Sequence, residues 1–71
     1  MKHVQILIGK KVRALRIEAG LSQEIFAAQA GIHRSHMGEI ERGEVDLTLS
    51  LLVRIAQALD IAPSALVRGI A

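Results

Sequence analysis

Polar side chains follow one another at the start of one short segment of this 71-residue chain. His33, Arg34, Ser35 and His36 are consecutive, and Glu39 comes one helical turn after Ser35. An arginine can donate two hydrogen bonds to guanine, a carboxylate can accept one from cytosine, and a serine can pair with any base. On a helix, Arg34, Ser35 and Glu39 line one edge. The segment therefore suits the DNA major groove.

Two other interpretations of the same segment remain open. The polar residues could form an ordinary solvated surface, in which Glu39 would contact Ser35 at i,i+4. His33 and His36 could hold a metal, because His-x-x-His puts both rings on one helix face. Two ligands make a weak site, however, and no cysteine or third histidine is near, so we expect no metal. Protonated rings beside phosphates predict DNA affinity that rises as pH falls through about 6.5, the ordinary histidine value.

No enzyme constellation accompanies these residues. The chain has no Cys, Tyr or Trp, and its serines have no evident His–Asp partners. The glycines form no phosphate-binding loop. We therefore expect no catalysis and no cofactor. A chain of this length leaves no room for a ligand-sensing domain, so we expect no small-molecule ligand either.

Size and composition predict one small helical domain. The chain is 51% hydrophobic with a single Phe, which favours helices over a β-sandwich. Without cysteine there is no disulfide, so tight helix packing and self-association are the expected sources of stability. The apolar stretch Val4–Ile8 is too short for a signal peptide, and no segment reaches the ~20 residues that span a bilayer. We expect a cytoplasmic protein without a membrane partner.

The net charge of +2 is unevenly distributed. Residues 1–17 carry +5 with no acid, and residues 18–71 carry −3. A basic end on a near-neutral body indicates contact with a polyanion, and a solvated helix face explains the charge equally well. The candidate phosphate contacts in this end are Lys10, Lys11 and Arg13.

Glycine, proline and capping residues divide the chain into helical stretches. Apolar spacing predicts helices over about 5–19, 22–31, 33–41 and 49–59, with a short fifth helix from Pro63. Ser22 and Thr48 are the expected N-caps of the second and fourth helices. His33 is a poor N-cap, which indicates that its side chain is used elsewhere.

The fourth helix has more apolar residues than one face can hold. Its expected core face consists of Leu49, Leu52, Ile55, Ala56 and Leu59. A helix that is apolar all round must be buried all round, and one small domain cannot do this. We therefore expect a dimer seam on the fourth and fifth helices, formed by Leu51, Leu66, Val67 and Ile70.

Taken together, these segments resemble the helix-turn-helix domain of the lambdoid phage repressor and Cro superfamily (XRE-like). The resemblance runs from about Ile8 to Val67. The matching segments are Leu15-Arg16, Gly20-Leu21-Ser22-Gln23, Ala27, Ala30-Gly31-Ile32, Ile40-Glu41-Arg42-Gly43 and Leu52–Leu59. The family usually has Ser at His33, Pro at Leu47 and Gly at Asp60, departures that affect cap stability and sequence preference. The resemblance implies an all-α five-helix domain over residues 1–71, with the helix-turn-helix at about 22–42 and dimerisation at about 47–71.

The resemblance also implies roles for individual residues, because Arg34, Ser35 and Glu39 match the base-reading positions of the family. Gln23 would contact a phosphate and help to hold the third helix, at a helix N-terminus that favours anions in any case. Arg16 and Glu41 would form a partly buried ion pair between the first and third helices. The residues implied to lie against or beside the DNA backbone are Ser22, Gln23, His33, His36, Arg42 and Arg16.

We therefore expect a transcriptional regulator that binds double-stranded DNA as a homodimer. Its recognition helix, about His33–Glu41, would enter the major groove of a two-fold symmetric operator. Chains this short resemble controller proteins of restriction–modification systems, small phage repressors and the antitoxins of toxin–antitoxin pairs. The alternative in another class is a protein-interaction module that has the same fold and does not bind DNA.

Overall fold

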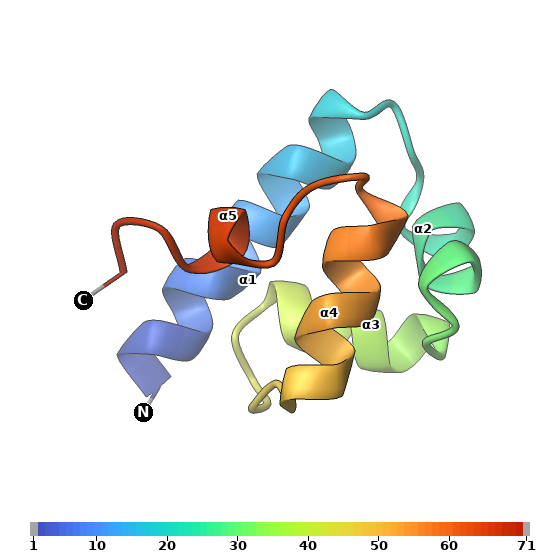
Figure 1. The fold of residues 1–71 in the computed structure, drawn as a ribbon. Helices are drawn as coiled ribbons and strands as arrows, with labels where there is room; N and C mark the ends of the chain where they lie inside the picture. The colour runs from blue at the N-terminus through green and yellow to red at the C-terminus, as the bar shows by residue number, and fades with distance from the viewer. Residues whose placement is uncertain (1, 71) are drawn as a thin grey trace.

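In the computed structural model, which describes residues 2–70, the chain forms five helices and no strand (Figure 1). The helices are α1 (Lys2–Glu18), α2 (Gln23–Ala30), α3 (Arg34–Glu41), α4 (Leu49–Ala58) and α5 (Ser64–Val67). The expected all-α, five-helix fold class is confirmed. The first helix begins at Lys2 rather than near Gln5, because no helix-breaking residue separates the two positions.

Side-chain caps and left-handed residues mark the helix ends where the sequence predicts them. The Ser22 hydroxyl accepts a hydrogen bond from the Ile25 amide at 3.1 Å, and Thr48 does the same for Leu51 at 3.1 Å. Gly31 ends α2 with φ of 69°. Asp60, where the family favours glycine, also takes a left-handed conformation with φ of 57°.

The core takes a fully buried side chain from every helix. These side chains are Val12 of α1, Phe26 of α2, Met37 and Ile40 of α3, Ile55 of α4 and Leu66 of α5. No single element has an isolated apolar face, so the packing of each helix depends on the others. About 1.5–3 kcal/mol per fully buried side chain of this size is the ordinary gain from removing it from water.

Two expectations for apolar residues are wrong. Leu49, assigned to the core face, is 80% exposed because it opens the first turn of α4, beyond the edge of the core. Leu66, assigned to the dimer seam, is 0% exposed because α5 packs against both α1 and α4 and turns this side chain inward. Leu66 is therefore part of the monomer core and is not available to a second chain.

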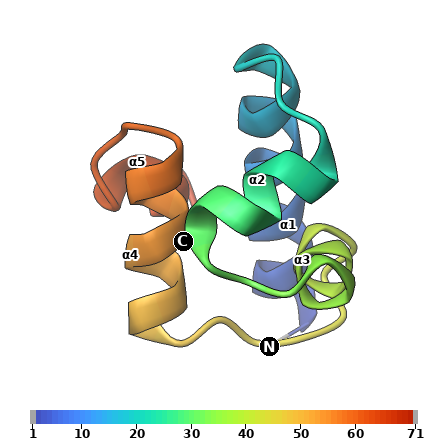
Figure 2. The ribbon, with the colours of Figure 1, turned by 90° about the vertical axis from the view of Figure 1, so that its right-hand side faces the viewer.

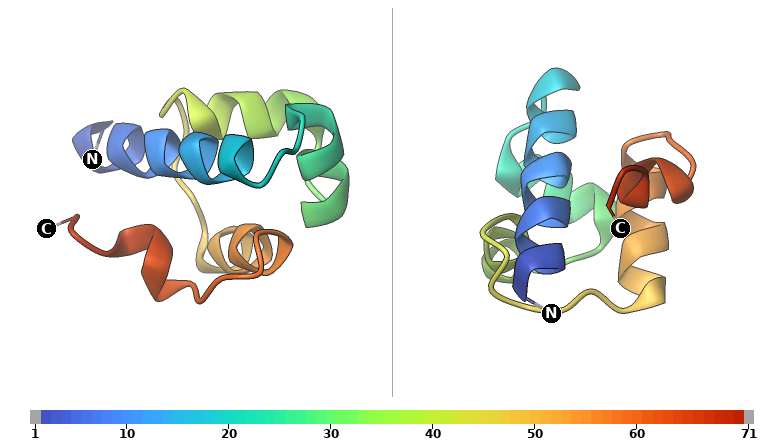
Figure 3. Two further views of the ribbon diagram at one scale, coloured as in Figure 1. Left: turned by 90° about the horizontal axis from the view of Figure 1, so that it is seen from above. Right: turned by 90° about the vertical axis from the view of Figure 1, so that its left-hand side faces the viewer.

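The backbones of α1 and α3 are in direct contact. The two helices run alongside one another, with α4 and α5 on the other side of the core (Figure 3). A Cβ atom built on Gly9 would lie 2.5 Å from the carbonyl oxygen of Ile40. Only glycine fits this crossing, so the position of α3 is set by main-chain atoms.

The helix α2 crosses between α3 and α4 and contacts both (Figure 2). The tight turn after α2 brings α3 to the outside of the molecule, away from α4. Within residues 2–70, no helix is long and apolar enough to cross a membrane.

Candidate nucleic-acid interface

The outer face of α3 presents the side chains expected to read bases. Arg34 and Ser35 are exposed, whereas His36 and Glu39 are half-buried. On the opposite side of the same helix, Met37 is fully buried and anchors α3 to the core. The helical period thus separates a polar, accessible face from a packed one.

Arg34 lies beside an acid of the preceding helix. Its Nη1 is 3.7 Å from the Glu24 Oε2, and the two side chains are 68% and 75% exposed. Pairs this exposed contribute about 0–1 kcal/mol, so Glu24 leaves the guanidinium free to turn toward another partner. Glu24 is also in the first turn of α2, where a negative charge is favourable.

The His33 ring caps α3, contrary to the expectation that it is used elsewhere. Its Nδ1 accepts a hydrogen bond from the Ser35 amide at 3.2 Å and lies 2.8 Å from the Ser35 Oγ. The extended backbone of His33, with ψ of 140°, folds the ring over the first turn of the helix. An imidazole nitrogen thus takes the place of the hydroxyl or carboxylate oxygen usual at this position.

A buried carboxylate ties the far end of α3 to α1 and α2. The Glu41 side chain, 2% exposed, accepts hydrogen bonds from Arg16 at 2.7 and 3.0 Å. Gln23 donates to the same carboxylate at 3.2 Å, and Arg16 also reaches the Leu21 carbonyl at 2.9 Å. Because the charge is paired and its oxygens are occupied, burial does not leave an isolated ion. Gln23 therefore already has a structural partner in the protein.

Arg42 follows α3 and is paired with an acid two residues later. Its Nε and Nη2 donate to the Glu44 carboxylate at 2.9 and 3.2 Å. This hydrogen bonding, with the charge of Glu44, raises the pKa of Arg42 above its ordinary range. Arg42 is exposed and stays charged at every working pH, so it is accessible to a phosphate.

The basic residues of α1 are in different surroundings. Lys11 donates to the main-chain carbonyl of Arg68 at 2.7 Å and so links α1 to the segment after α5. Lys10 and Arg13 are exposed. Of the three, only the last two lie open on the surface.

Arg54, which sequence reasoning did not single out, connects α4 to the helix-turn-helix. Its Nε donates to the Ala30 carbonyl at 3.1 Å, and its Nη2 donates to the Gly31 carbonyl. These carbonyls lie at the end of α2, where a helix has no internal donors left. The need for donors there is visible in the sequence, but the residue that supplies them lies 24 positions later.

The remaining apolar residues of α4 and α5 are only partly covered. Val53 is 38% exposed and Val67 is 41% exposed, in addition to Leu49. Leu51 and Ile70 are half-buried. These side chains lie on α4, on α5 or, for Ile70, just after α5, and they remain at least partly accessible in one chain.

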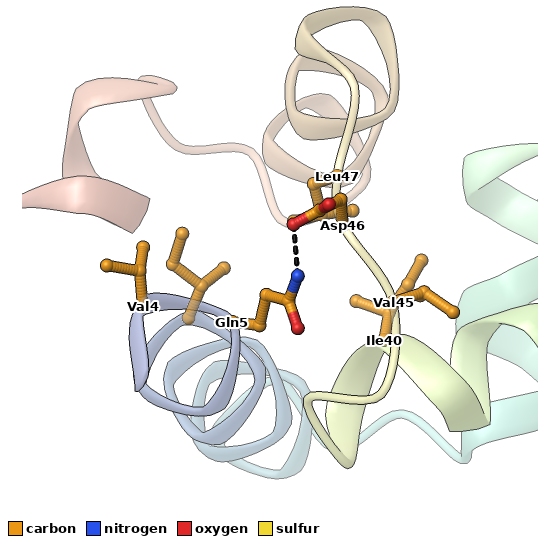
Figure 4. Close-up of a pocket in the computed structure, with 7 residues that line it drawn as sticks. Val4, Gln5, Ile40, Val45, Asp46 and Leu47 are labelled. Carbon is orange, nitrogen blue, oxygen red and sulfur yellow. Dashed lines mark hydrogen bonds between the residues drawn. The ribbon is translucent and has the colours of Figure 1, made fainter. Parts of the chain in front are cut away.

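Neither a metal centre nor a large cavity accompanies the polar face. Within residues 2–70, no three His, Cys, Asp or Glu side chains are grouped to hold a metal ion. A cavity of about 240 Å³ lies between the start of α1 and the α3–α4 linker, with Gln5 bonded to Asp46 across it (Figure 4). Its other lining residues are apolar: Val4, Ile8, Ile40, Val45 and Leu47.

Comparisons with known proteins point to one family. Residues 12–66 match a family model described as helix-turn-helix. The control protein C.BamHI of Bacillus amyloliquefaciens is 34% identical over 62 residues, which cover 86% of this chain and 76% of that protein. The control protein C.MunI of a Mycoplasma species is 39% identical over 67 residues, covering 93% and 90%. The crystal structure of the restriction–modification controller protein C.AhdI from Aeromonas hydrophila superimposes with a TM-score of 0.86 at 40% identity, covering 87% of this chain and 94% of that chain.

Proposed function

We propose a mode of action for this chain, which belongs to the helix-turn-helix family of DNA-binding regulators and is related to restriction–modification controller proteins. We propose that it binds a two-fold symmetric operator as a homodimer, with one α3 in the major groove of each half-site. Arg34, Ser35 and Glu39 read base edges. Ser22, Gln23, His33, His36, Arg42 and Arg16 position the helix on the backbone.

One observation carries this proposal. The exposed polar face of α3 is supported from behind by the buried contacts of Glu41 with Arg16 and Gln23. A protein that reads bases must hold its reading helix in one orientation, because hydrogen bonds to base edges require fixed geometry. A solvated surface helix has no need of a buried ion pair at its far end.

The homodimer is supported by the apolar side chains that one chain leaves uncovered. Leu49, Val53 and Val67 are exposed on α4 and α5, and Leu51 of α4 and Ile70 after α5 are half-buried. These residues form the proposed seam, without Leu66. A dimer that inserts its two recognition helices into successive major grooves must hold them about 34 Å apart, one turn of B-DNA.

Selection of bound duplexes from random DNA tests the proposal. We expect a site with two-fold symmetry, bound by a species of twice the monomer mass in sedimentation equilibrium. Binding to random duplex should weaken as salt rises, as for any protein that contacts phosphates. A failure to bind random duplex at low salt would instead favour a protein-interaction module. An adjacent restriction gene or toxin gene would separate a controller from an antitoxin.

A further inference from the structure

Beyond capping the helix, the His33 ring fixes the hydrogen-bonding direction of a neighbouring side chain. We propose that His33 is a specificity-determining residue: when neutral, it forces the Ser35 hydroxyl to present acceptors to DNA, and when protonated, it reverses this. The inference rests on the proposed function, because it concerns which base Ser35 selects. It follows from two contacts made by one nitrogen atom.

The main chain decides which His33 nitrogen carries the proton. The Ser35 amide is always a donor, and it points at Nδ1 from 3.2 Å. Nδ1 must therefore be unprotonated, which leaves the proton of the neutral ring on Nε2. A bare nitrogen can only accept, so the Ser35 Oγ at 2.8 Å must be the donor in the second contact.

This direction determines what Ser35 can offer to a base. A hydroxyl has one proton and two lone pairs, and here the proton is used inside the protein. The lone pairs of Ser35 then face outward as acceptors. In the major groove they match the amino groups of adenine N6 and cytosine N4, and they do not match the acceptors of guanine and thymine. A serine that would otherwise pair with any base becomes selective.

Protonation of His33 reverses the direction. With a proton on Nδ1, the ring donates to Ser35 Oγ and can no longer accept from the Ser35 amide. The Ser35 O–H group then no longer makes a hydrogen bond inside the protein. It can donate instead to guanine N7 or O6 or to thymine O4. Histidine side chains in general change charge between about pH 5 and 8.

In the free chain, the charged groups on the elements packed around α3 lie beside partners other than His33. Glu24 of α2 pairs with Arg34, and Arg16 of α1 pairs with Glu41 at the far end of the helix. Arg54 of α4 donates to the carbonyls of Ala30 and Gly31 just before His33. On α3 itself, His36 lies about one turn after the cap. The variants below separate its effect from that of His33.

Nitrogen NMR of the free protein tests the first step without DNA. Long-range proton–nitrogen spectra distinguish a bare Nδ1 from a protonated one, and we expect the Nε2–H tautomer for His33 at about pH 7.5. Detection of the Nδ1–H tautomer would overturn the inference and would leave the proposed function intact.

Selection from random duplex at about pH 7.5 and about pH 5.5 tests the second step. For the wild type we expect adenine or cytosine at the position read by residue 35, with a preference of about fivefold, the usual scale of one hydrogen bond. At the lower pH the preference should move to guanine or thymine. Ser35→Ala should lose the preference at both pH values.

Two matched variants identify the titrating group. Asn is a good N-cap that accepts through an oxygen and does not titrate, so His33→Asn should keep the adenine or cytosine preference at both pH values. His36→Asn should keep the pH-dependent change. A wild-type preference that stays constant between the two pH values, on duplexes that are still bound, would overturn the inference. A Ser35→Ala protein that selects the same base would also do so. If the folded wild-type protein binds no duplex at either pH, this result would instead refute the proposed function.

Discussion

The Nε of Arg54 on α4 lies 3.1 Å from the carbonyl oxygen of Ala30 on α2. One long side chain thus supplies the donors that the end of α2 lacks, and it reaches there from the helix that carries the proposed seam. The turn that sets the angle of α3 is therefore tied to α4 as well as to α1.

Replacing Arg54 should destabilise the fold. In Arg54→Met, the last carbonyls of α2 lose donors from a charged group, a contact usually worth about 1.5–3 kcal/mol. We expect urea unfolding to show a loss of about 1–2 kcal/mol, because the side chain is partly exposed. Arg13→Met, on the exposed face of α1, is the matched control and should change the free energy of unfolding little. Equal effects of the two variants would show that the capping contact does not matter.

Breaking the ion pair of Arg16 and Glu41 should lower the free energy of unfolding more than the replacement of Arg54 does. Glu41→Gln leaves the buried guanidinium without its counter-charge, and such changes cost about 3–5 kcal/mol. Because a domain of this size has about that much stability in total, we expect largely unfolded protein by circular dichroism at 25 °C. The double variant Arg16→Met/Glu41→Leu removes both charges and should recover much of the loss. If the double variant is no more stable than Glu41→Gln, the cost lies in packing rather than in the unpaired charge.

For the substitution Gly9→Ala, helix propensity and packing predict opposite changes in stability. Propensity alone would make Gly9→Ala stabilising by about 1 kcal/mol. The new Cβ would meet the Ile40 carbonyl oxygen at 2.5 Å, however, and that backbone cannot give way cheaply. We therefore expect destabilisation of about 1–3 kcal/mol in thermal or urea unfolding. Ala14→Gly, on the exposed side of α1, measures how much an alanine–glycine exchange changes stability in the same helix without the close contact. A stabilised Gly9→Ala protein would contradict the close crossing of α1 and α3.

Arg34 should determine one base pair in each half-site. Removal of a bidentate contact to guanine usually costs about 1–3 kcal/mol of discrimination. Arg34→Ala should therefore bind a symmetric site with relaxed preference at that pair alone, as measured by selection from random duplex. Arg13→Ala serves as the control, and any loss of affinity that it causes should be uniform across sequences. Unchanged preference in Arg34→Ala would assign base reading to another residue.

The proposed seam can be tested with a substitution that leaves the monomer core intact. Leu49 is 80% exposed, so Leu49→Lys should not affect folding but should place a charge inside the dimer contact. We expect monomers in sedimentation equilibrium, an unchanged helical spectrum and weaker binding to a two-fold symmetric site. Ile17→Lys on α1, where the residue replaced is 52% exposed, is a control of the same chemistry away from the seam. Dimers that persist in Leu49→Lys would show that the dimer contact does not include this residue.

The helices and their caps were predictable from local signals. Ser22 and Thr48 precede apolar periodicity, and the structure shows both capping as expected. The all-α fold also followed from the order of the family segments. These features depend on residues within one or two turns of each other, where spacing alone gives the geometry.

The assignments that failed depend on how elements pack. A helical wheel cannot tell whether Leu49 or Leu66 faces the core, because the answer depends on where α5 crosses α1 and α4. Arg54 was overlooked for the same reason, since its acceptors belong to a distant helix. His33 was misjudged because the preference for oxygen caps is a statistical one, and a ring nitrogen can satisfy the same amide.

Three arginines around α3 each have a carboxylate alongside: Arg16 has Glu41, Arg34 has Glu24 and Arg42 has Glu44. Each carboxylate offsets attraction to phosphate, so fewer counterions are released when the protein meets arbitrary DNA. A genome presents roughly 10⁶–10⁹ competing sites, and the occupancy of an operator depends on how weakly these are held. Little of the protein would then be sequestered on bulk chromosome, and the concentration available to the operator would follow the rate of its synthesis closely.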